Sequence, residues 1–371
     1  MDISGMIDVY YSDNFNRPND QDFGGQSNDF YNFNDKTDQF SISAAKFSLN
    51  HDPDPVGAHV DFIYGRTNDF INAPVSNASS ADQLNFIEQA FLSLKPTKAK
   101  GFELDFGKFV TSAGAEVIES KDNWNYSRSL LFSYAIPYWH FGVRTSMPVS
   151  KTDTIGVQVV NGWNNVAKSN GGATIVLTNA LTKPKYAWNV NYIVGPENSL
   201  TSNGFRNLID TTLLFTPNAK FNAYINYDYG QNRDGLVTLP GDDCDSATKK
   251  PGILFSREIP TCTEGDKALN HWQGIAGAFH EQATAKNAIA GRFEYFTDPQ
   301  GFETGTQAFG GQNLYEFTGT YEYKWLEGLL MRAEYRADFS NKDVFSKDVG
   351  QFVKSQQTLT LAFVAFFGPK R

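Results

Sequence analysis

The residues best suited to chemistry in this chain are charged side chains rather than nucleophiles or redox groups. One set belongs to a single polar segment, residues 111–136, and consists of Glu116, Glu119, Asp122 and Arg128. A second set alternates with apolar residues in other segments and consists of Arg144, Arg292, Arg332, Glu334, Arg336 and Asp338. Carboxylates that face arginines across a water-filled gap create a transverse field, which orders water and selects solutes by charge and dipole. The alternative is that the last four residues only pair with one another as structural ion pairs.

Motifs for catalysis or metal binding are weak by comparison. The sequence His280-Glu281-Gln282-Ala283-Thr284 lacks the second histidine of a zinc-protease helix. Asp242, Asp243 and Asp245 offer oxygens for calcium, but the glycine and distal glutamate of a calcium loop are absent, which favours a solvated acidic loop. We therefore expect no enzyme activity, no metal site and no cofactor. A membrane-embedded esterase, with Ser and His adjacent on one wall, is the alternative that a single sequence leaves open.

The two cysteines, Cys244 and Cys262, have 17 residues between them inside one polar segment. We interpret them as a disulfide that closes this loop, since a zinc site needs four ligands and no histidine is near either cysteine. A disulfide implies an oxidising compartment. Because Met1 is followed directly by Asp2, we expect no signal peptide in this sequence. Of a cytosolic protein and a mature chain whose signal peptide has been removed, we expect the second, because of the strand pattern described next.

Composition excludes several classes of protein. The chain of 371 residues contains 31 Phe, 17 Tyr and 6 Trp, an aromatic content that argues against disorder. No window approaches the roughly 18 consecutive apolar residues of a membrane helix. Its 32 basic and 41 acidic residues give a net charge of -9, and no run of Lys and Arg exceeds a pair. Nucleic acid is therefore not an expected partner.

The charged residues alternate with apolar ones at a period of two, which is the period of a β-strand. In residues 329–339, Leu, Met, Ala, Tyr and Phe occupy one face, while Arg332, Glu334, Arg336 and Asp338 occupy the other. Residues 221–229 repeat the scheme. Applied throughout, the pattern predicts about sixteen strands of the length that a tilted membrane strand requires. They are 2–11, 38–50, 55–66, 84–95, 101–110, 137–147, 152–162, 173–181, 184–194, 207–217, 219–229, 269–282, 285–297, 312–325, 328–339 and 356–367.

The connections between these strands decide the fold class. Short turns alternate with long polar loops, which is typical of an outer-membrane barrel with periplasmic turns and extracellular loops. Apolar and polar residues also alternate along the strands of a soluble sandwich or propeller, but short and long connections would not alternate there. We therefore predict one domain over residues 1–371, an all-β, transmembrane, antiparallel up-and-down barrel of about sixteen strands with a long extracellular loop at 230–268. Strict alternation would place Lys108 on the lipid face, so we also predict a bulge at Gly107.

At this point the chain also resembles a known family. The resemblance is carried by Gly107 to Glu119 (GKFVTSAGAEVIE), Asn125 to Tyr138 (NYSRSLLFSYAIPY), Asn161-Gly162-Trp163-Asn164-Asn165, Val194-Gly195-Pro196-Glu197, Glu294-Tyr295-Phe296 and Glu334-Tyr335-Arg336-Ala337-Asp338. These residues are similar to the putative β-barrel porin-2, OmpL-like family of Gram-negative bacteria, over nearly the whole chain. The resemblance implies an outer-membrane porin, with membrane lipid around it and a homotrimer as its assembly.

Resemblance to sixteen-stranded porins also implies a role for segment 111–136, which is the third long loop. In such porins this loop folds inward and narrows the lumen. The charged residues of the two sets described at the beginning, four in segment 111–136 and six in other segments, are therefore the predicted pore constriction. The implied function is passive diffusion of small polar solutes or ions, in the bacterial outer membrane. The alternatives are a sheath or scaffold around a partner protein, and an adhesin that uses the loops at 12–37 and 230–268.

Overall fold

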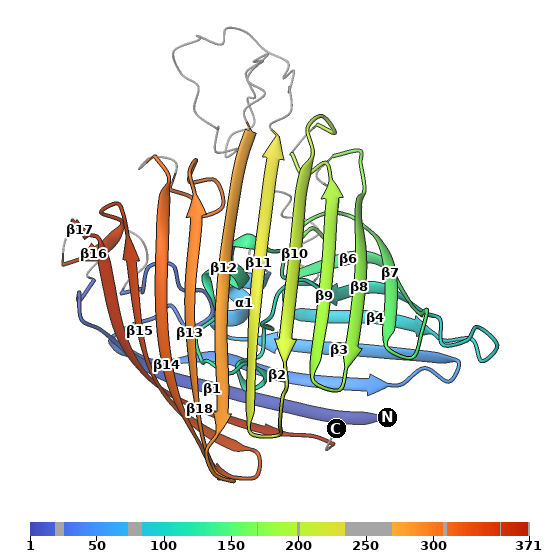
Figure 1. Ribbon diagram of the computed structural model, residues 1–371, viewed down its shortest axis with the longest axis horizontal. Helices are drawn as coiled ribbons and strands as arrows, with labels where there is room; N and C mark the ends of the chain where they lie inside the picture. Colours follow the sequence, from blue (N-terminus) through green and yellow to red (C-terminus); the bar gives the residue numbers. More distant parts are fainter. Residues whose placement is uncertain are drawn as a thin grey trace, which may run out of the picture.

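Alternation of apolar and polar residues gives each strand one face for lipid and one for the barrel interior. The computed structural model describes residues 1–18, 26–72, 84–168, 170–198, 201–233, 269–306, 310–348 and 350–369. Within these ranges sixteen antiparallel strands form a closed barrel, and two further strands, β16 and β17, form a small separate sheet (Figure 1). The predicted fold class is confirmed.

Each predicted segment overlaps one barrel strand. The strands are β1 (Asp2–Asn14), β2 (Gln39–His51), β3 (Val56–Tyr64), β4 (Ile87–Leu94), β5 (Glu103–Val110), β6 (Trp139–Pro148), β7 (Asp153–Val160), β8 (Thr174–Lys183), β9 (Tyr186–Gly195), β10 (Arg206–Phe215), β11 (Phe221–Arg233), β12 (Leu269–Gln282), β13 (Asn287–Asp298), β14 (Gln312–Leu326), β15 (Leu329–Ser340) and β18 (Ser355–Phe367). The pattern did not predict β16 (Phe345–Lys347), β17 (Gln351–Val353), α1 (Arg66–Ile71), η2 (Ser120–Asp122) or η3 (Leu131–Ala135). No helix in the described ranges is long and apolar enough to cross a membrane.

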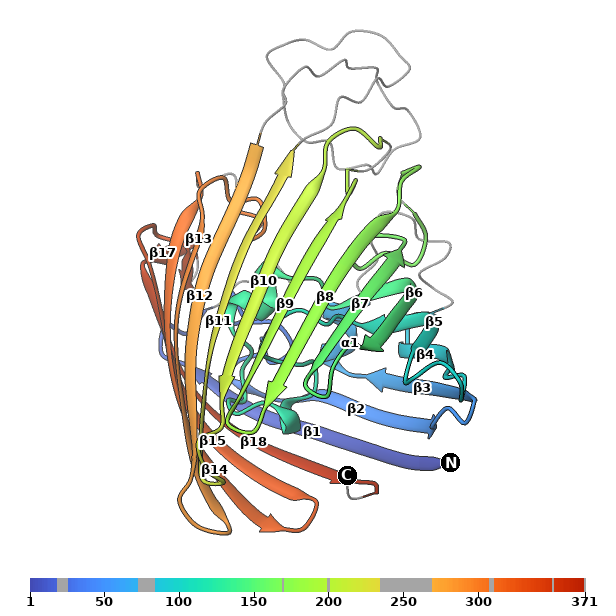
Figure 2. The same ribbon diagram turned by 45° about the vertical axis from the view of Figure 1, so that its right-hand side comes forward.

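The barrel closes between the first and last strands. β1 pairs with β18 from Gly5 opposite Phe367 to Asn14 opposite Thr358, and β18 pairs on its other side with β15. β16 and β17 therefore belong to the connection between β15 and β18. Both chain termini lie at the same rim of the barrel, as the views in Figures 1 and 2 agree.

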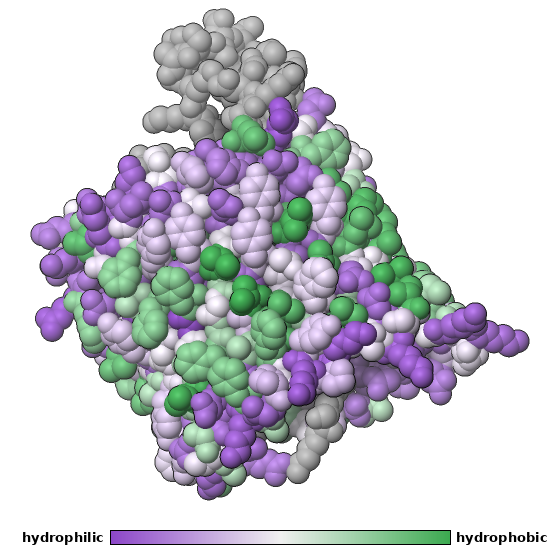
Figure 3. Space-filling view, viewed as in Figure 1, coloured by the Kyte–Doolittle hydropathy of each residue, from purple (hydrophilic) through white to green (hydrophobic). Residues whose placement is uncertain are grey.

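The two faces of β15 show how the alternation sorts side chains. Tyr335 and Phe339 are 37% and 45% exposed, whereas Glu334 and Arg336 are 2% and 1% exposed. Apolar and aromatic side chains cover the middle of the outer surface in Figure 3, and strongly polar ones gather toward its margins. An apolar outer band with polar margins is the surface that a membrane barrel presents to lipid.

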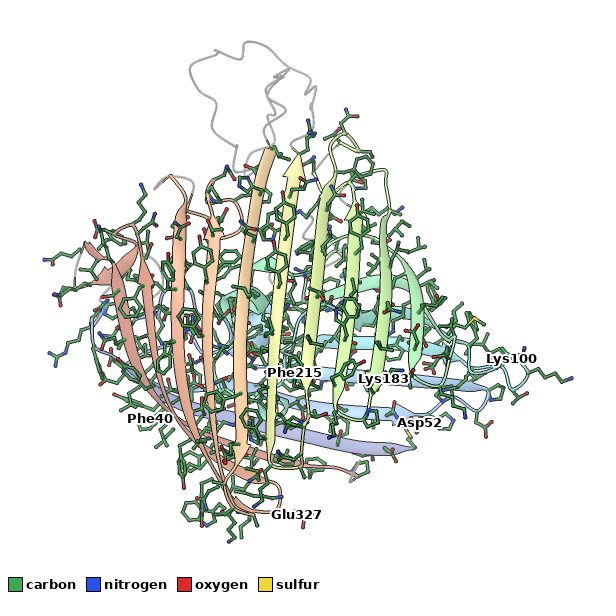
Figure 4. All side chains as sticks on the ribbon, viewed as in Figure 1. Phe40, Asp52, Lys100, Lys183, Phe215 and Glu327 are labelled. Carbon is green, nitrogen blue, oxygen red and sulfur yellow. The ribbon has the colours of Figure 1, made fainter. Side chains whose placement is uncertain are left out.

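The short turns mark one rim of the barrel. Asp52, Lys100, Lys183 and Glu327 belong to turns or strand ends on this rim. Figure 4 shows Lys100 and Asp52 on the right, Lys183 at the lower end of β8 and Glu327 at the bottom. Phe40, at the opposite end of β2, lies on the left of the same view. The long connections therefore share the other rim, including residues 111–138 between β5 and β6.

The predicted bulge at Gly107 is wrong. β5 pairs with both β4 and β6 without a register shift at this residue. Gly107 instead has a φ of 144°, and a Cβ there would approach the carbonyl oxygen of Ala90 to 2.1 Å, so only glycine fits. Lys108 is 1% exposed, and its ammonium donates to Asn72 Oδ1 at 2.5 Å and to the Ile87 carbonyl at 2.7 Å. Burial against protein, rather than a register shift, keeps its charge away from lipid.

Candidate functional site

Loop 111–136 occupies the barrel interior, because its residues bond to inward side chains on distant walls. On the way out from β5, Ser112 Oγ donates to Asn191 Oδ1 on β9 at 2.8 Å. The backbone N–H of Ala115 then donates to Asn226 Oδ1 on β11 at 3.1 Å. These contacts lead the loop past β9 and β11, away from the strands between which it begins.

The tip of the loop reaches the seam where the barrel closes. Ser120 Oγ donates to Asp8 Oδ2 on β1 at 2.6 Å, and Arg332 Nη2 on β15 donates to the Asn123 carbonyl at 2.7 Å. Glu119 forms an ion pair with Lys46 on β2. The tip is thus attached to β15, β1 and β2 at the same time.

On the returning half of the loop, wall side chains bind its backbone. The Glu334 carboxylate accepts from the N–H groups of Tyr126 at 2.5 Å and Ser127 at 2.8 Å. The Glu294 carboxylate accepts from the N–H groups of Leu130 and Leu131 at 3.1 and 3.2 Å. Leu130 precedes η3 and Leu131 begins it. The first N–H groups of a helix lack partners within the helix, so the Glu294 carboxylate is a favourable acceptor for them.

Arginines from the wall supply the complementary contacts to carbonyl groups. Arg292 Nη1 donates to the Ser127 carbonyl at 2.7 Å, and Arg336 Nη1 donates to the Arg128 carbonyl at 2.8 Å. Arg292 also pairs with Glu116 of the loop at 2.7 Å and with Glu294 at 3.0 Å, and it is 1% exposed. The inward charges of β13 and β15 therefore fix the path of the loop mainly through its main chain.

The predicted constriction residues fall into two groups by exposure. Seven are buried between loop and wall, with exposures of 6% or less: Glu116, Arg128, Arg292, Arg332, Glu334, Arg336 and Asp338. Arg336 pairs with Asp338 at 2.8 Å along the wall, and Arg292 pairs with Glu116 of the loop, so both kinds of pairing considered from the sequence occur. The side chains of Glu119, Asp122 and Arg144 remain 16%, 53% and 29% exposed.

Arg128 and Arg144 occupy different surroundings. Arg128 Nη1 donates to the Tyr126 carbonyl at 2.7 Å, and its guanidinium lies 4.9 Å from the ring centre of Phe33. Arg144 pairs with Asp105 at 2.7 Å on the wall formed by β5 and β6, far along the barrel from β13–β15. The structure therefore does not gather all ten residues around one point.

A second set of charged residues lines a cavity at the rim of short turns. This cavity, which we call the vestibule, has a volume of about 1080 Å³ and is lined in part by Lys46, Asp61, Glu119, Lys121, Asp122 and Lys324. Lys46 Nζ lies 2.9 Å from Asp61 and 2.6 Å from Glu88. Sequence reasoning missed Lys46, Asp61 and Glu88. The inward parity of Lys46 and Asp61 could have identified two of them, but Glu88 stands at a register shift between β3 and β4.

Toward the rim of long loops, the interior is filled by apolar side chains of the loops themselves. Phe33 of the first long loop packs against Phe132 and Tyr138, with ring centres 5.9 and 5.4 Å apart. Trp272 of β12 is fully buried and donates to the Ala135 carbonyl at 3.1 Å. Cys244 and Cys262 lie outside the described residues, so the predicted disulfide stays a prediction.

The sequence profile described as "Putative beta-barrel porin-2, OmpL-like" matches residues 1–367. No curated protein matches. Similar solved structures include an anion-selective porin from Comamonas acidovorans (TM-score 0.59, 8% identity, 98% of both chains covered) and the outer-membrane channel DcaP of Acinetobacter baumannii (0.57, 10%, 98% of this chain and 96% of that chain). A trimer form of OmpT, an outer-membrane protein of Vibrio cholerae, is also similar (0.55, 11%, 98% of both chains). At these identities the structural likeness establishes the fold.

Proposed function

Because the chain belongs to the putative beta-barrel porin-2, OmpL-like family, we propose that small hydrophilic solutes or ions diffuse passively through its lumen. Loop 111–136 narrows the passage, and the charged side chains that remain exposed beside it select solutes by charge. The bacterial outer membrane is the location that the family and the barrel fold indicate. Assembly as a homotrimer is part of the proposal, supported by the trimer form of a similar barrel.

One observation carries this proposal: a charged, partly exposed vestibule lies directly beside the tip of an inward loop. Glu119 and Asp122 belong to the tip, and both line the vestibule together with wall residues such as Lys46. A polar, charge-lined interior next to an inserted loop suits a selective aqueous passage.

The sheath alternative requires room for a partner protein inside the barrel. The packing of Phe33, Phe132 and Tyr138 leaves the interior near the long loops occupied by the chain itself, which argues against the sheath. An adhesin would use the outer loops, and most of the segment 230–268 lies outside the described residues. An enzymatic role is not part of the proposal, since the family is described as porins and the similar structures include a porin and a channel.

Single-channel recording of the refolded protein in planar lipid bilayers tests the proposal. Discrete conductance steps, with a reversal potential in a salt gradient, are expected of an open selective pore. The Asp122→Asn variant should change the reversal potential because its side chain faces the vestibule. Protein that is shown to be folded and inserted but that conducts no current would refute the pore and favour an adhesin.

A further inference from the structure

The vestibule contains one cation surrounded by carboxylates from three different elements. Lys46 projects inward from β2, and its ammonium contacts Glu119 of the loop tip. The same ammonium lies 2.6 Å from Glu88 on β4 and 2.9 Å from Asp61 on β3. The Lys46 side chain is 8% exposed, and the side chains of Asp61 and Glu88 are at most 1% exposed. We call the three acidic residues the carboxylate ring.

A local irregularity of the wall builds this ring. Gln89 is opposite Asp61 and Ile87 is opposite Phe62, so Glu88 is the extra residue of a bulge between β3 and β4. Gln89 lines the vestibule, so regular alternation would turn Glu88 away from the interior. A bulge re-aims a side chain, and here it places Glu88 beside Lys46.

The ring has the composition of a cation site. One oxygen from each of Asp61, Glu88 and Glu119 lies within 4.8 Å of the other two. Carboxylates this close repel one another unless a positive charge lies between them. Three carboxylates also supply the oxygen ligands that a hard divalent cation prefers. The Lys46 ammonium occupies the position that such a cation would take, and His59 Nε2, 2.9 Å from Asp61, is the nearest further basic group that contacts the ring.

We propose that Lys46 is a specificity-determining residue of the pore, acting as a tethered counter-ion that fills the carboxylate ring and limits the preference of the pore for cations. This inference rests on the proposed pore function. Without the ammonium, the ring would bind permeating cations and repel anions. With it, the negative charge that the ring presents to the vestibule is reduced by one.

A different role for Lys46 predicts a different result. If Lys46 served only to anchor the loop tip through Glu119, then Lys46→Met and Glu119→Gln would remove the same contact and change the pore in the same direction. As a counter-ion, Lys46 opposes the charge of Glu119. The two variants should then shift ion selectivity in opposite directions, which an anchor alone would not do.

The first test measures reversal potentials in a KCl gradient. Lys46→Met should raise the cation-to-anion permeability ratio by about sevenfold. Unit charges roughly 7 Å apart in water interact by about one RT, which favours cations and disfavours anions by about 2.7-fold each. Glu119→Gln should lower the ratio, and it leaves Lys46 paired with two carboxylates, so this variant should fold. Lys46→Arg is the control for this test, because it keeps a positive charge beside the ring and should leave the ratio near the wild-type value. Lys121, which lines the same vestibule but pairs with Asp122 rather than with the ring, provides the control for the binding test below. Shifts of the same sign in the first two variants, or a Lys46→Met shift no larger than the control, would overturn the inference.

A second test does not depend on conductance. Binding of Mn²⁺ to the refolded proteins in detergent can be followed by the loss of the free-ion signal in electron paramagnetic resonance. Lys46→Met should bind Mn²⁺ more tightly than the wild type and Lys121→Met, and this gain should disappear in the double variant Lys46→Met/Glu88→Gln. If no variant conducts, the proposed pore function is wrong, but Mn²⁺ binding still tests whether Lys46 fills the carboxylate ring. No gain in Mn²⁺ binding would overturn the assignment of Lys46 as a tethered counter-ion.

Discussion

Replacing Glu334 with glutamine removes the carboxylate that holds the returning half of loop 111–136. Glu334 accepts the N–H groups of Tyr126 and Ser127 and the hydroxyl of Thr320 at 2.7 Å, and it is 2% exposed. A glutamine has one carbonyl oxygen, and its amide group is a donor that cannot accept an N–H. At least one loop N–H would then lose its partner inside the barrel.

The magnitude follows from the number and kind of bonds. A hydrogen bond to a charged group contributes about 1.5–3 kcal/mol, so losing one of the two backbone bonds weakens loop docking by about that amount. At 1.4 kcal/mol per factor of ten, the opening equilibrium of the loop should rise by about one to two orders of magnitude. Hydrogen–deuterium exchange of peptides that cover residues 123–131 measures this change directly.

Asp105→Asn is the matched control for this experiment. Asp105 is also an inward, buried carboxylate on a strand, but its partners are Ser93 and Arg144 rather than the loop. Exchange in 123–131 should remain near the wild-type rate in that variant. If Glu334→Gln gives a folded barrel whose 123–131 peptides exchange like those of the wild type, the carboxylate does not hold the loop and the reasoning is refuted.

Three further predictions concern the wall, the lipid face and an outer loop. Arg292→Met leaves Glu116, Glu294 and Glu316 without their shared buried cation, and denaturant unfolding should show a loss of about 3–5 kcal/mol, against a smaller loss for Arg144→Met, whose side chain is 29% exposed. Phe317→Arg places a charge on the outer face, where Phe317 is 51% exposed, and should cost about 2–4 kcal/mol of folding into lipid vesicles; a near-neutral result would contradict a lipid-facing position. Burial raises the pKa of Glu303 in the loop after β13 to about 7, against the opposing charge of Arg206. Since the folded form holds its proton more tightly than the unfolded form, loop stability should be highest below the ordinary glutamate pKa and fall as the pH rises to about 7. The protection factors of amides 302–304, which correct for the intrinsic rise of amide exchange with pH, should therefore be lower at pH 8 than at pH 5, and Glu303→Gln should abolish this difference.

The strands could be predicted because their signal is local. In β15, residues two apart share a face, so the alternation of Arg332, Glu334 and Arg336 with apolar residues defines both the strand and its inward side. The parity of short and long connections then gave the barrel. β16 and β17 escaped prediction because three residues are too few to show a period of two.

The site was only partly predictable, because its geometry depends on contacts between distant segments. Residue type and position identified Glu116 and Arg292, but nothing local indicates that they pair with each other or that wall carboxylates bind loop N–H groups. Glu88 was missed because a bulge turns its side chain to the inner side of the barrel wall. A bulge depends on how two strands pair, which the local sequence does not show. Gly107 illustrates the opposite error, since the lysine beside it is accommodated by burial rather than by a register shift.

The two sets of charges lead to separate consequences for transport. A carboxylate such as Glu334, whose oxygens already accept loop N–H groups and which is 2% exposed, has little surface left for a passing ion. Its removal should therefore alter the width and steadiness of the passage before it alters charge selectivity. Lys46 and Asp122 line the vestibule, so changing them should alter selectivity, while the contacts of Ser120 and Asn123 still hold the loop tip to β1 and β15. Conductance and reversal potential, measured on the same variants, separate these two effects. A change in the electric field affects cations and anions in opposite directions, whereas a change in the width of the passage affects both alike.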